Sequence, residues 1–253
     1  MSIQIGIAGI SGRMGRMLAE EVAAAGASLV GGISRSGDAQ GVRLFPDIAA
    51  LAAAADLVID FTHAGTVIAH ARAMRAAAKP WVLGTTGLSQ ADEAAVTEAA
   101  AAIPVLAAPN FSPGVNLVFA LAERMAAALP AAGYDAEIVE MHHRQKVDAP
   151  SGTALELGRA VAAGRGQALD AVMVAGRSGH TGPRKEGEIG IAALRGGQIV
   201  GSHSVLFTAP HEQITLTHHA FDRRNFATGA VRGALWLAAR PPGRYGMRDV
   251  LGI

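Results

Sequence analysis

The fold is decided near the amino terminus by the stretch Ile3-Gln4-Ile5-Gly6-Ile7-Ala8-Gly9-Ile10-Ser11-Gly12-Arg13-Met14-Gly15. β-Branched residues alternate tightly up to Ala8 and give way to Gly9, which predicts a buried strand followed by a breaker. A helix is predicted over residues 13–25, ending at Gly26. The glycines between them permit a tight turn, close approach of the backbone to a pyrophosphate, and close packing of helix on strand. Their spacing is GxxGxxG rather than GxGxxG, and such a turn can be only a turn, but its place at a first βα junction favours dinucleotide binding.

Strands and helices alternate through the first part of the chain. Further strands are predicted at 28–33, 57–61, 81–83 and 104–107, and helices at 67–78 and 89–102. This spacing is typical of βαβ units, which build a parallel sheet with right-handed crossovers.

The pattern changes after Pro109-Asn110-Phe111-Ser112-Pro113-Gly114, which we interpret as a linker or hinge. The predicted elements that follow are a helix at 115–128, a strand at 137–142, a helix from Gly152, β segments at 189–194, 199–207 and 213–217, and a helix at 226–239. The three β segments have no helices between them, which favours a mixed or antiparallel sheet. The predicted fold class is α/β, with a Rossmann-type parallel-sheet domain plus an α+β domain that contains a mixed sheet.

Bulk composition narrows the function classes. The chain has 253 residues, no cysteine and a formal net charge of +1. The absence of cysteine excludes disulfides and thiolate metal sites, and the near-zero charge gives no electrostatic reason to expect a nucleic-acid partner. The first residues begin directly as a strand without a basic segment, so no signal peptide is predicted, and no apolar run has the character of a membrane span. We therefore expect a cytoplasmic protein with no nucleic-acid partner and no membrane partner.

The end of the second predicted strand bears on which dinucleotide binds. An acidic residue that accepts from the ribose 2′-hydroxyl usually stands about twenty residues after the glycines. Here the sequence is Ser34-Arg35-Ser36, with no acid before Asp38. The missing carboxylate and the guanidinium of Arg35 favour a 2′-phosphate, and hence NADPH over NADH. The alternative is that Arg35 is only a loop arginine.

Polar segments follow the carboxyl ends of three predicted strands. They are Asp60-Phe61-Thr62, Gly84-Thr85-Thr86 and Pro109-Asn110-Phe111. Each alone can be a turn or a cap. Ligands bind at this edge of an open α/β sheet, so the convergence of the three segments predicts a binding site there.

A second cluster of functional groups lies in His142-His143-Arg144-Gln145-Lys146-Val147-Asp148-Ala149-Pro150-Ser151-Gly152-Thr153-Ala154. Imidazole can donate or accept a proton near neutral pH. Arg144, Lys146 and the amides of a helix beginning near Gly152 can hold carboxylates. Lysine occurs at only three positions, 79, 146 and 185, so Lys146 indicates a site that requires a compact ammonium. The alternative is a solvated basic strand end followed by an ordinary capped helix.

The histidine pairs argue against a metal. His142 and His143 are predicted to be adjacent on a strand, so their side chains would point to opposite faces and not share an ion. The sequence has neither cysteine nor a His-x-x-x-His spacing, so we expect no catalytic metal. The pair His218-His219 is interpreted as structural. No role is predicted for the remaining histidines, His63, His70, His180, His203 and His211.

At these residues the sequence resembles the dihydrodipicolinate reductase family, whose members are also called 4-hydroxy-tetrahydrodipicolinate reductases. The matching segments are 9–15, 60–62, 84–87, 110–112, 140–154, 179–184, 226–237 and 247–251, and together they cover essentially the whole chain. Segment 140–154 is the most specific. The resemblance implies an NAD(P)H-dependent oxidoreductase that reduces 4-hydroxy-tetrahydrodipicolinate to tetrahydrodipicolinate in lysine and diaminopimelate biosynthesis. It also implies a dinucleotide-binding domain at 1–111 and 223–253, a substrate-binding and tetramerisation domain at 112–222, and a homotetramer.

The resemblance assigns roles residue by residue. His142 matches the proton donor and Lys146 the second catalytic residue, and the substrate is a small dicarboxylate. The substrate-binding positions are His143, Gly152 and Thr153. The positions that match cofactor contacts are Gly9, Ile10, Ser11, Gly12, Arg13, Met14, Arg35, Gly84, Thr85, Thr86, Ala108, Pro109, Asn110 and Phe111. Ser34 stands where some members carry an acid that serves NADH, so NADPH is the expected cofactor, with NADH as an alternative.

Two other functions compete with this one. The first is another NAD(P)-dependent reductase of a small amino-acid-derived substrate, such as an aspartate- or homoserine-type dehydrogenase, and segment 140–154 argues against it. The second is a non-catalytic NADPH-binding regulator on the same scaffold. The intact His142 and Lys146 argue against that.

Overall fold

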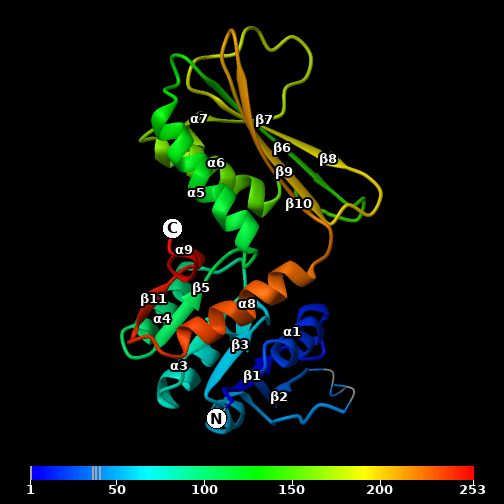
Figure 1. Cartoon of the computed structure of the whole chain (residues 1–253), viewed down its shortest axis with the longest axis vertical. Coiled ribbons are helices and arrows are strands. Elements are labelled where there is room, and N and C mark those ends of the chain that lie inside the picture. The colour runs from blue at the N-terminus through cyan, green and yellow to red at the C-terminus, as the bar shows by residue number, and fades with distance from the viewer. Residues whose placement is uncertain (1, 36, 38, 40) are drawn as a thin grey trace. The chain divides into compact units, whose positions relative to one another are not determined.

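A computed structural model of the chain describes residues 2–35, 37, 39 and 41–253 (Figure 1). Ser36 and Asp38, which belong to the segment that predicts NADPH, lie outside the described residues. The chain forms two compact units. The first comprises Met1–Pro113 and Arg224–Gly252, and the second comprises Gly114–Arg223 and Ile253. Each unit has hydrophobic clusters of its own.

The first unit is built on a six-stranded sheet in which neighbouring strands are parallel. Its strands, in sheet order, are β11 (Gly243–Tyr245), β5 (Pro104–Ala107), β4 (Trp81–Leu83), β3 (Leu57–Asp60), β1 (Gln4–Ala8) and β2 (Ser28–Ile33). The strand order reverses at β1, because β2 lies on one side of it and β3 on the other. Such a switch point opens a crevice at the carboxyl ends of the strands, where α/β sheets bind ligands.

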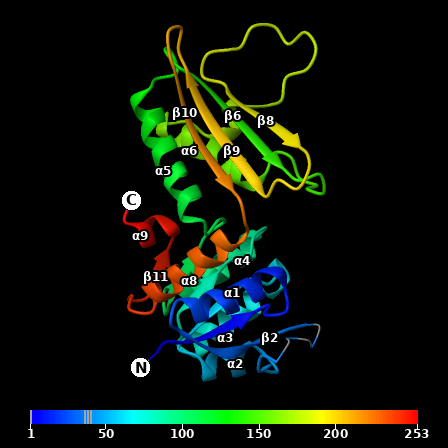
Figure 2. The ribbon, with the colours of Figure 1, turned by 45° about the vertical axis from the view of Figure 1, so that its right-hand side comes forward.

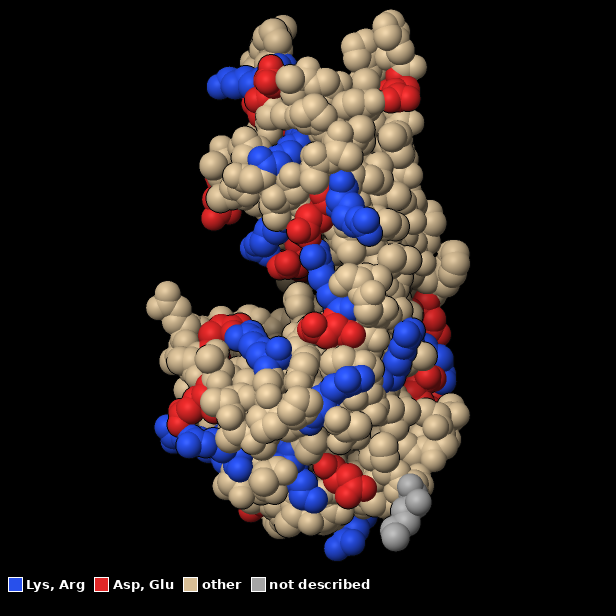
Figure 3. Space-filling model, turned by 60° about the vertical axis from the view of Figure 1, so that its left-hand side comes forward, with Lys and Arg blue, Asp and Glu red and all other residues tan. Residues whose placement is uncertain are grey.

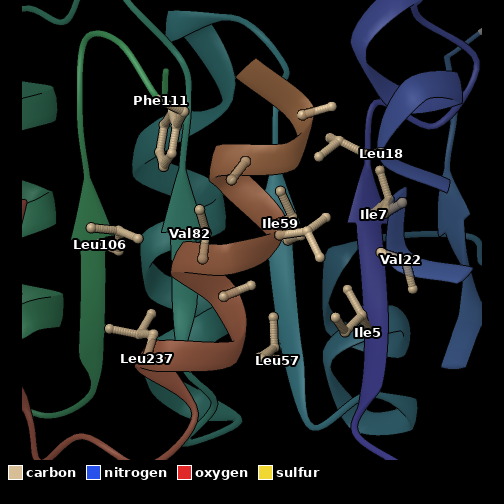
Figure 4. Close-up of a cluster of buried hydrophobic side chains, with 14 of the residues drawn as sticks. Ile5, Ile7, Leu18, Val22, Leu57, Ile59, Val82, Leu106, Phe111 and Leu237 are labelled. Carbon is tan, nitrogen blue, oxygen red and sulfur yellow. The ribbon is translucent and has the colours of Figure 1, made fainter. Parts of the chain in front are cut away.

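Helices cover both faces of this sheet. One face carries α1 (Arg13–Ala24), α8 (Arg224–Leu237) and α9 (Met247–Leu251); the other carries α2 (Ile48–Ala54), α3 (Val67–Ala76) and α4 (Gln90–Ala100). A 3-10 turn, η1 (Ala64–Thr66), directly precedes α3. Leu57 and Ile59 pack in the cluster with α1 and α8 (Figure 4), whereas Val58 belongs to the cluster on the opposite face. Burial of both faces explains why these strands are continuous apolar runs in the sequence.

The second unit is built on a mixed sheet. Its strands, in sheet order, are β10 (Gln213–Ala220), β9 (Gly201–Thr208), β6 (Asp135–His142), β8 (Ile189–Arg195) and β7 (Met173–Ala175). Strand β9 is antiparallel to both of its neighbours, whereas β6, β8 and β7 are parallel. The helices of this unit are α5 (Pro113–Ala128), α6 (Gly152–Gly164) and α7 (Leu169–Val172), and Figure 2 shows α5 and α6 on one side of the sheet. Ile138, Leu157 and Phe207 share the buried cluster between this sheet and its helices.

Strand β6 alternates strictly between a buried and a more exposed face. Ala136, Ile138, Glu140 and His142 are buried, and the residues between them are partly exposed. Because side chains alternate along a strand, a carboxylate and an imidazole continue the apolar row of β6. The fold thus places two ionisable groups at the carboxyl end of a core strand.

The structure confirms the Rossmann-type parallel sheet and the mixed sheet that the sequence predicts. The sequence does not predict α2, η1, α7, β7, β11 and α9, which are three to seven residues long and too short to show a side-chain period. One prediction is wrong: β6 ends at His142, so His143 lies beyond the strand. The chain turns there, because the N–H of Lys146 donates to the carbonyl of His143 at 3.1 Å.

Within the described part of the chain, no helix combines the length and apolar character needed to cross a bilayer. Figure 3 shows basic and acidic side chains interspersed on the face that it presents. On that face, the two signs are mixed and no extended field of one sign arises.

Candidate active site

The glycine-rich turn between β1 and α1 has the tight geometry that the sequence predicts. Gly9 has a φ of +87°, which favours glycine, and the N–H groups of Gly9 and Ile10 donate to the carbonyl of Ile33 at 3.0 and 3.2 Å. A Cβ on Gly15 would lie 2.2 Å from the carbonyl oxygen of Gly9, so only glycine lets α1 approach the turn this closely. Gly12 is the N-cap of α1 and offers no side-chain acceptor to the N–H groups of the first turn.

The segments that follow four strands of the first unit converge at one edge of its sheet. In the register of the sheet, Ala8 pairs with Asp60, Asp60 with Leu83, and Leu83 with Ala107. The glycine turn begins directly after Ala8, and the three polar segments predicted from the sequence begin at Asp60, directly after Leu83, and two residues after Ala107. They therefore share the edge where an α/β sheet binds ligands.

Asp60 is buried and organises this edge from within. Its carboxylate accepts hydrogen bonds from Oγ1 of Thr62 at 2.6 Å and from Nε1 of Trp81 at 3.3 Å. Nδ1 of His70 lies 2.7 Å from the same carboxylate. These contacts hold the turn after β3, so Asp60 supports the edge of the sheet rather than facing a ligand.

The next segment along the edge contains a close backbone approach and an unpaired hydroxyl. A Cβ on Gly84 would lie 2.3 Å from the ring of Phe61, which in turn lies 5.4 Å from the ring of Phe111. Oγ1 of Thr85 is buried and has no hydrogen-bond partner among the described residues. Buried polar atoms normally have partners, so Thr85 fits a site that a bound polar group completes.

Two residues at the end of β2 complete the edge. Oγ of Ser34 donates to Oγ of Ser11 at 2.7 Å, which ties the strand end to the glycine turn. Arg35 is exposed. Because Ile33 pairs with Ala8, these residues stand at the same edge as the turn. The residues of the edge fit a dinucleotide, since the turn admits phosphates and a cation stands after the second strand.

The second unit contains a cluster centred on Glu140, which is fully buried on β6. Arg195, at the end of β8, makes two hydrogen bonds to this carboxylate, at 2.8 and 2.9 Å. The backbone N–H of Ser151 donates to it at 3.0 Å, and Nδ1 of His142 lies 2.6 Å from Oε2. Both oxygens of the carboxylate therefore have two partners.

The surroundings determine the charge and the tautomer of this pair. Burial raises the pKa of Glu140, but the hydrogen bonds that the carboxylate accepts, foremost from Arg195, outweigh burial and hold the pKa below its usual value. Burial lowers the pKa of His142, and contact with Glu140 offsets only part of this effect. An ionised carboxylate can only accept, so Nδ1 of His142 carries a proton and Nε2 is the nitrogen left for chemistry. Gly201 stands beside that nitrogen, since a Cβ there would lie 3.1 Å from Nε2.

A second buried imidazole packs against the first. The ring of His203, on β9, meets that of His142 edge-on with centroids 5.1 Å apart, and its Nε2 lies 3.2 Å from Oγ of Ser151. Burial, with a smaller contribution from His142, lowers the pKa of His203 to about 4. His203 is therefore a neutral neighbour of His142 at pH 7.

Lys146 lies in the loop after β6. Its Nζ donates to Oδ1 of Asp148 at 2.8 Å, and this hydrogen bond lowers the pKa of the Asp148 carboxyl below its usual value. The ammonium is one of the cations whose charge acts on His142. Lysine has three N–H donors, so the bond to Asp148 leaves two for other acceptors.

The predicted substrate-binding residues lie in the same unit. Gly152 and Thr153 open α6, which Ser151 caps by accepting from the backbone N–H three residues on. Nε2 of His143 lies 3.3 Å from Nη2 of Arg223. The start of a helix and a cation are both groups that hold carboxylates.

The structure divides the predicted site residues between the units. The predicted catalytic and substrate-binding residues are in the second unit, and the predicted cofactor-binding residues are in the first. Among residues that the structure describes, no group of three or more His, Cys, Asp or Glu side chains is arranged to hold a metal ion.

Sequence reasoning did not find Glu140, Arg195 and His203 as members of the site. Glu140 could have been predicted from the sequence, because it stands two residues before His142 and the strand period puts both side chains on one face. Arg195 and His203 come from other strands. Only the register, which pairs Arg195 with His142 and His203 with Glu140, brings them together.

Comparison with known proteins identifies the family of the chain. The family model described as "Dihydrodipicolinate reductase, N-terminus" matches residues 3–111, and "Dihydrodipicolinate reductase, C-terminus" matches residues 114–251. The chain is 65% identical over 251 residues to the 4-hydroxy-tetrahydrodipicolinate reductase of Acidiphilium cryptum (strain JF-5), covering 99% of this chain and 98% of the relative. It is 62% identical over 256 residues to the protein of the same name from Granulibacter bethesdensis, covering 100% and 98%.

A solved structure is similar along the whole chain. It is a dipicolinate-bound dihydrodipicolinate reductase from Paenisporosarcina sp. TG-14, with a TM-score of 0.78 and 25% identity, covering 98% of this chain and 99% of that one. The family models match both halves of the chain, and the relatives align with nearly its whole length. The chain therefore belongs to the dihydrodipicolinate reductase family.

Proposed function

We propose that this protein reduces 4-hydroxy-tetrahydrodipicolinate to tetrahydrodipicolinate with NADPH, and that His142 supplies the proton. Its family makes it an oxidoreductase of lysine and diaminopimelate biosynthesis. The observation that carries the proposal is the buried pair of Glu140 and His142. Lys146 is close enough for its charge to act on His142. Reduction of a cyclic dicarboxylate requires a general acid next to groups that hold carboxylates.

The first unit would hold the cofactor, which supplies the hydride when bound. The residues that would contact it are Gly9, Ile10, Ser11, Gly12, Arg13, Met14, Arg35, Gly84, Thr85, Thr86, Ala108, Pro109, Asn110 and Phe111. The bare backbone at Gly12 would admit a phosphate, and the hydroxyl of Thr85, which has no partner among the described residues, would offer a hydrogen bond. The exposed guanidinium of Arg35, with Ser34 in place of an acid, favours the 2′-phosphate of NADPH, with NADH as the weaker alternative.

The second unit would hold the dicarboxylate. The amides of Gly152 and Thr153 at the start of α6 take one carboxylate. The two remaining donors of Lys146, together with His143, take the other. The relative from Paenisporosarcina is dipicolinate-bound, and dipicolinate is a planar ring with two carboxylates. This supports a ligand of the same class here.

His142 would deliver the proton from Nε2. Burial keeps the free imidazole neutral, since its pKa is lowered. Two substrate carboxylates nearby favour the imidazolium and raise the pKa of His142 in the complex. The overall change adds a hydride and a proton to the substrate and releases one water. After donating its proton, the imidazole is neutral, and solvent protonates it again.

We also infer that residues 1–111 and 223–253 form the dinucleotide-binding domain, and residues 112–222 the substrate-binding and tetramerisation domain, of a cytoplasmic homotetramer. Apolar side chains on or next to the sheet of the second unit are exposed in the single chain, which supports its burial against other copies. They are Leu194, Ile214 and Phe221. Light scattering on the purified protein tests the assembly: a particle of four chains is expected, and a monomer at all concentrations would contradict it.

The functional test compares His142→Ala and Lys146→Ala with Lys185→Ala, an exposed lysine of the same unit. We expect turnover to fall about 10²–10⁴-fold in His142→Ala, the usual contribution of general acid catalysis. Turnover should also fall strongly in Lys146→Ala, whereas turnover of Lys185→Ala should stay at the wild-type level. NADPH affinity, measured by fluorescence titration, should be unchanged in all three. Wild-type turnover in His142→Ala would remove this residue from the proton-donor role.

A further inference from the structure

We propose that Glu140 is a positioning residue for His142: its carboxylate, held by Arg195, fixes the imidazole as the Nδ1–H tautomer and leaves Nε2 to exchange the proton. This inference rests on the proposed role of His142 as proton donor. The contact that carries it is the 2.6 Å approach of Nδ1 to Oε2 of a fully buried carboxylate.

The hydrogen bond matters because a histidine has two tautomers and a ring that can flip. A ring with Nε2–H and unprotonated Nδ1 would set a lone pair against the carboxylate, so contact with Glu140 excludes that form. It also fixes the ring orientation. Each time His142 gives up a proton it returns to the same neutral tautomer, with Nε2 ready to be protonated again.

Glu140 joins the parts of the site that the reaction uses. Arg195, which grips the carboxylate, also donates to the carbonyl of Asp148 at 2.6 Å, in the loop that carries Lys146. The N–H of Ser151, at the start of α6, donates to the same carboxylate at 3.0 Å. A single buried anion therefore connects the imidazole, the lysine loop and the helix start.

A purely structural role does not explain this arrangement. Burying a carboxylate costs desolvation free energy, which an apolar side chain does not cost. The attraction within a buried ion pair offsets this cost only when the geometry of the pair is good. An apolar residue after Ala136 and Ile138 would continue the core row of β6. The carboxylate is instead placed where it acts on His142.

The charges around His142 show why the carboxylate is needed. The titratable and charged groups that act on it or on its neighbour His203 are Glu140, Lys146, Arg195, His203 and His218. Asp148 pairs in turn with Lys146. Lys146 and Arg195 disfavour the imidazolium, whereas Glu140 favours it through direct contact. Without the carboxylate, His142 would remain buried near two cations and would hold its proton less well.

The first experiment compares Glu140→Gln, which keeps the side-chain shape, with Glu137→Gln. Glu137 is on the same strand and is paired with Arg177 at 3.0 Å and Arg184 at 2.9 Å. Glu137→Gln therefore also removes one ion-paired carboxylate and serves as the matched control. We expect kcat to fall about 10- to 100-fold in Glu140→Gln, a part of the usual general-acid contribution. KM and NADPH affinity should be unchanged, and Glu137→Gln should have wild-type kinetics.

The pH profile of kcat separates positioning from general damage. The acid must be protonated, so the rate falls as pH rises through the pKa of His142. Loss of the carboxylate lowers that pKa, and the falling limb should move to lower pH by about one unit or more in Glu140→Gln. A variant that is merely less well folded would lose amplitude without moving the limb.

A double variant shows whether Glu140 acts through His142. Adding Glu140→Gln to His142→Ala should cause no further loss of kcat, because the residue it positions is already gone. Independent, multiplied losses would overturn the inference. So would wild-type kcat in Glu140→Gln beside an inactive His142→Ala, which leaves the proposed function standing. Full turnover in His142→Ala would overturn both.

A measurement on the unaltered protein covers the case in which Glu140→Gln does not fold. The ¹⁵N shifts of histidine rings in the labelled wild-type protein report the tautomer directly. The inference requires His142 to be neutral with Nδ1–H near pH 7, and His142→Ala identifies its signal by loss. An Nε2–H tautomer would overturn the inference whatever the kinetics.

Discussion

Alanine at two glycines of the turn between β1 and α1 should have separable effects. Gly15→Ala should destabilise the protein without ligand, because the missing Cβ is what lets α1 pack on the turn. Gly12→Ala should leave stability nearly intact and weaken cofactor binding, because the missing Cβ keeps the backbone accessible to phosphate. The distances at the two positions set the magnitudes.

At Gly15 the added Cβ would lie 2.2 Å from the carbonyl oxygen of Gly9 and 2.6 Å from the carbonyl carbon of Ile10. Both are backbone atoms, and hydrogen bonds to Ile33 hold the turn, so helix or turn must shift. At distances this short to backbone atoms, overpacking costs about 2–3 kcal/mol, the upper part of its usual range, against a gain of about 1 kcal/mol when alanine replaces glycine within a helix. We expect a net loss of about 1–2 kcal/mol, which lowers Tm by about 2–8 °C for a chain of this size.

At Gly12 the added Cβ would lie 3.2 Å from the nearest atom, and φ −69° with ψ 166° suits alanine. The expected stability change is only about 0.5 kcal/mol, the disadvantage of alanine against glycine at an N-cap. The methyl group would stand where, in the proposed function, a cofactor phosphate approaches the first turn of α1. Loss of one charge-assisted hydrogen bond raises Kd about tenfold or more.

Thermal unfolding without ligand and NADPH titration by fluorescence measure both effects. The matched control is Gly133→Ala, where the nearest atom to the added Cβ is 3.9 Å away, and it should change neither quantity. An unchanged Tm in Gly15→Ala would refute the packing argument. Unchanged NADPH affinity in Gly12→Ala would refute the binding argument.

Three further predictions concern the cofactor, the buried histidine and the substrate site. Arg35→Ala should raise KM for NADPH about tenfold and barely affect NADH; equal weakening of both in steady-state kinetics would show that Arg35 is only a loop residue. His203 has a folded pKa of about 4 against an ordinary 6.5, so the fold should lose stability as pH falls from 6.5 to 4. This loss is at most about 3 kcal/mol, and His203→Gln should flatten it in denaturant titrations across that range; parallel curves would contradict the assignment. Pyridine dicarboxylates should inhibit competitively against the substrate, and monocarboxylate analogues much more weakly, because a missing carboxylate leaves donors such as Lys146 unpaired; inhibition constants of equal size would contradict the site.

The parts of the fold that could be predicted are those that local pattern determines. The strand before Gly9, the turn and α1 follow from an apolar alternation, three glycines and a helical stretch within one short segment. The elements that were not predicted, such as α2 and β11, are short, and their alanines or turn-like residues carry no period. They form because the rest of the sheet gives them a surface to pack on.

The candidate site was predictable in its local half only. His142 and Lys146 stand out because they occur in one short stretch with a helix start. Arg195 lies 55 residues from Glu140 in the sequence, and His203 lies 52 residues from Ser151. No spacing rule connects such pairs; sheet register between β6, β8 and β9 does.

The central claim is that the chain reduces 4-hydroxy-tetrahydrodipicolinate, and one coupled assay tests it most directly. The synthase that precedes it in the pathway forms the substrate from aspartate semialdehyde and pyruvate, and the loss of NADPH absorbance is followed after addition of this protein. The account predicts NADPH oxidation that requires the synthase and both of its substrates, and that stops when this protein is omitted. If the synthase is active and NADPH is not oxidised, the central claim is contradicted.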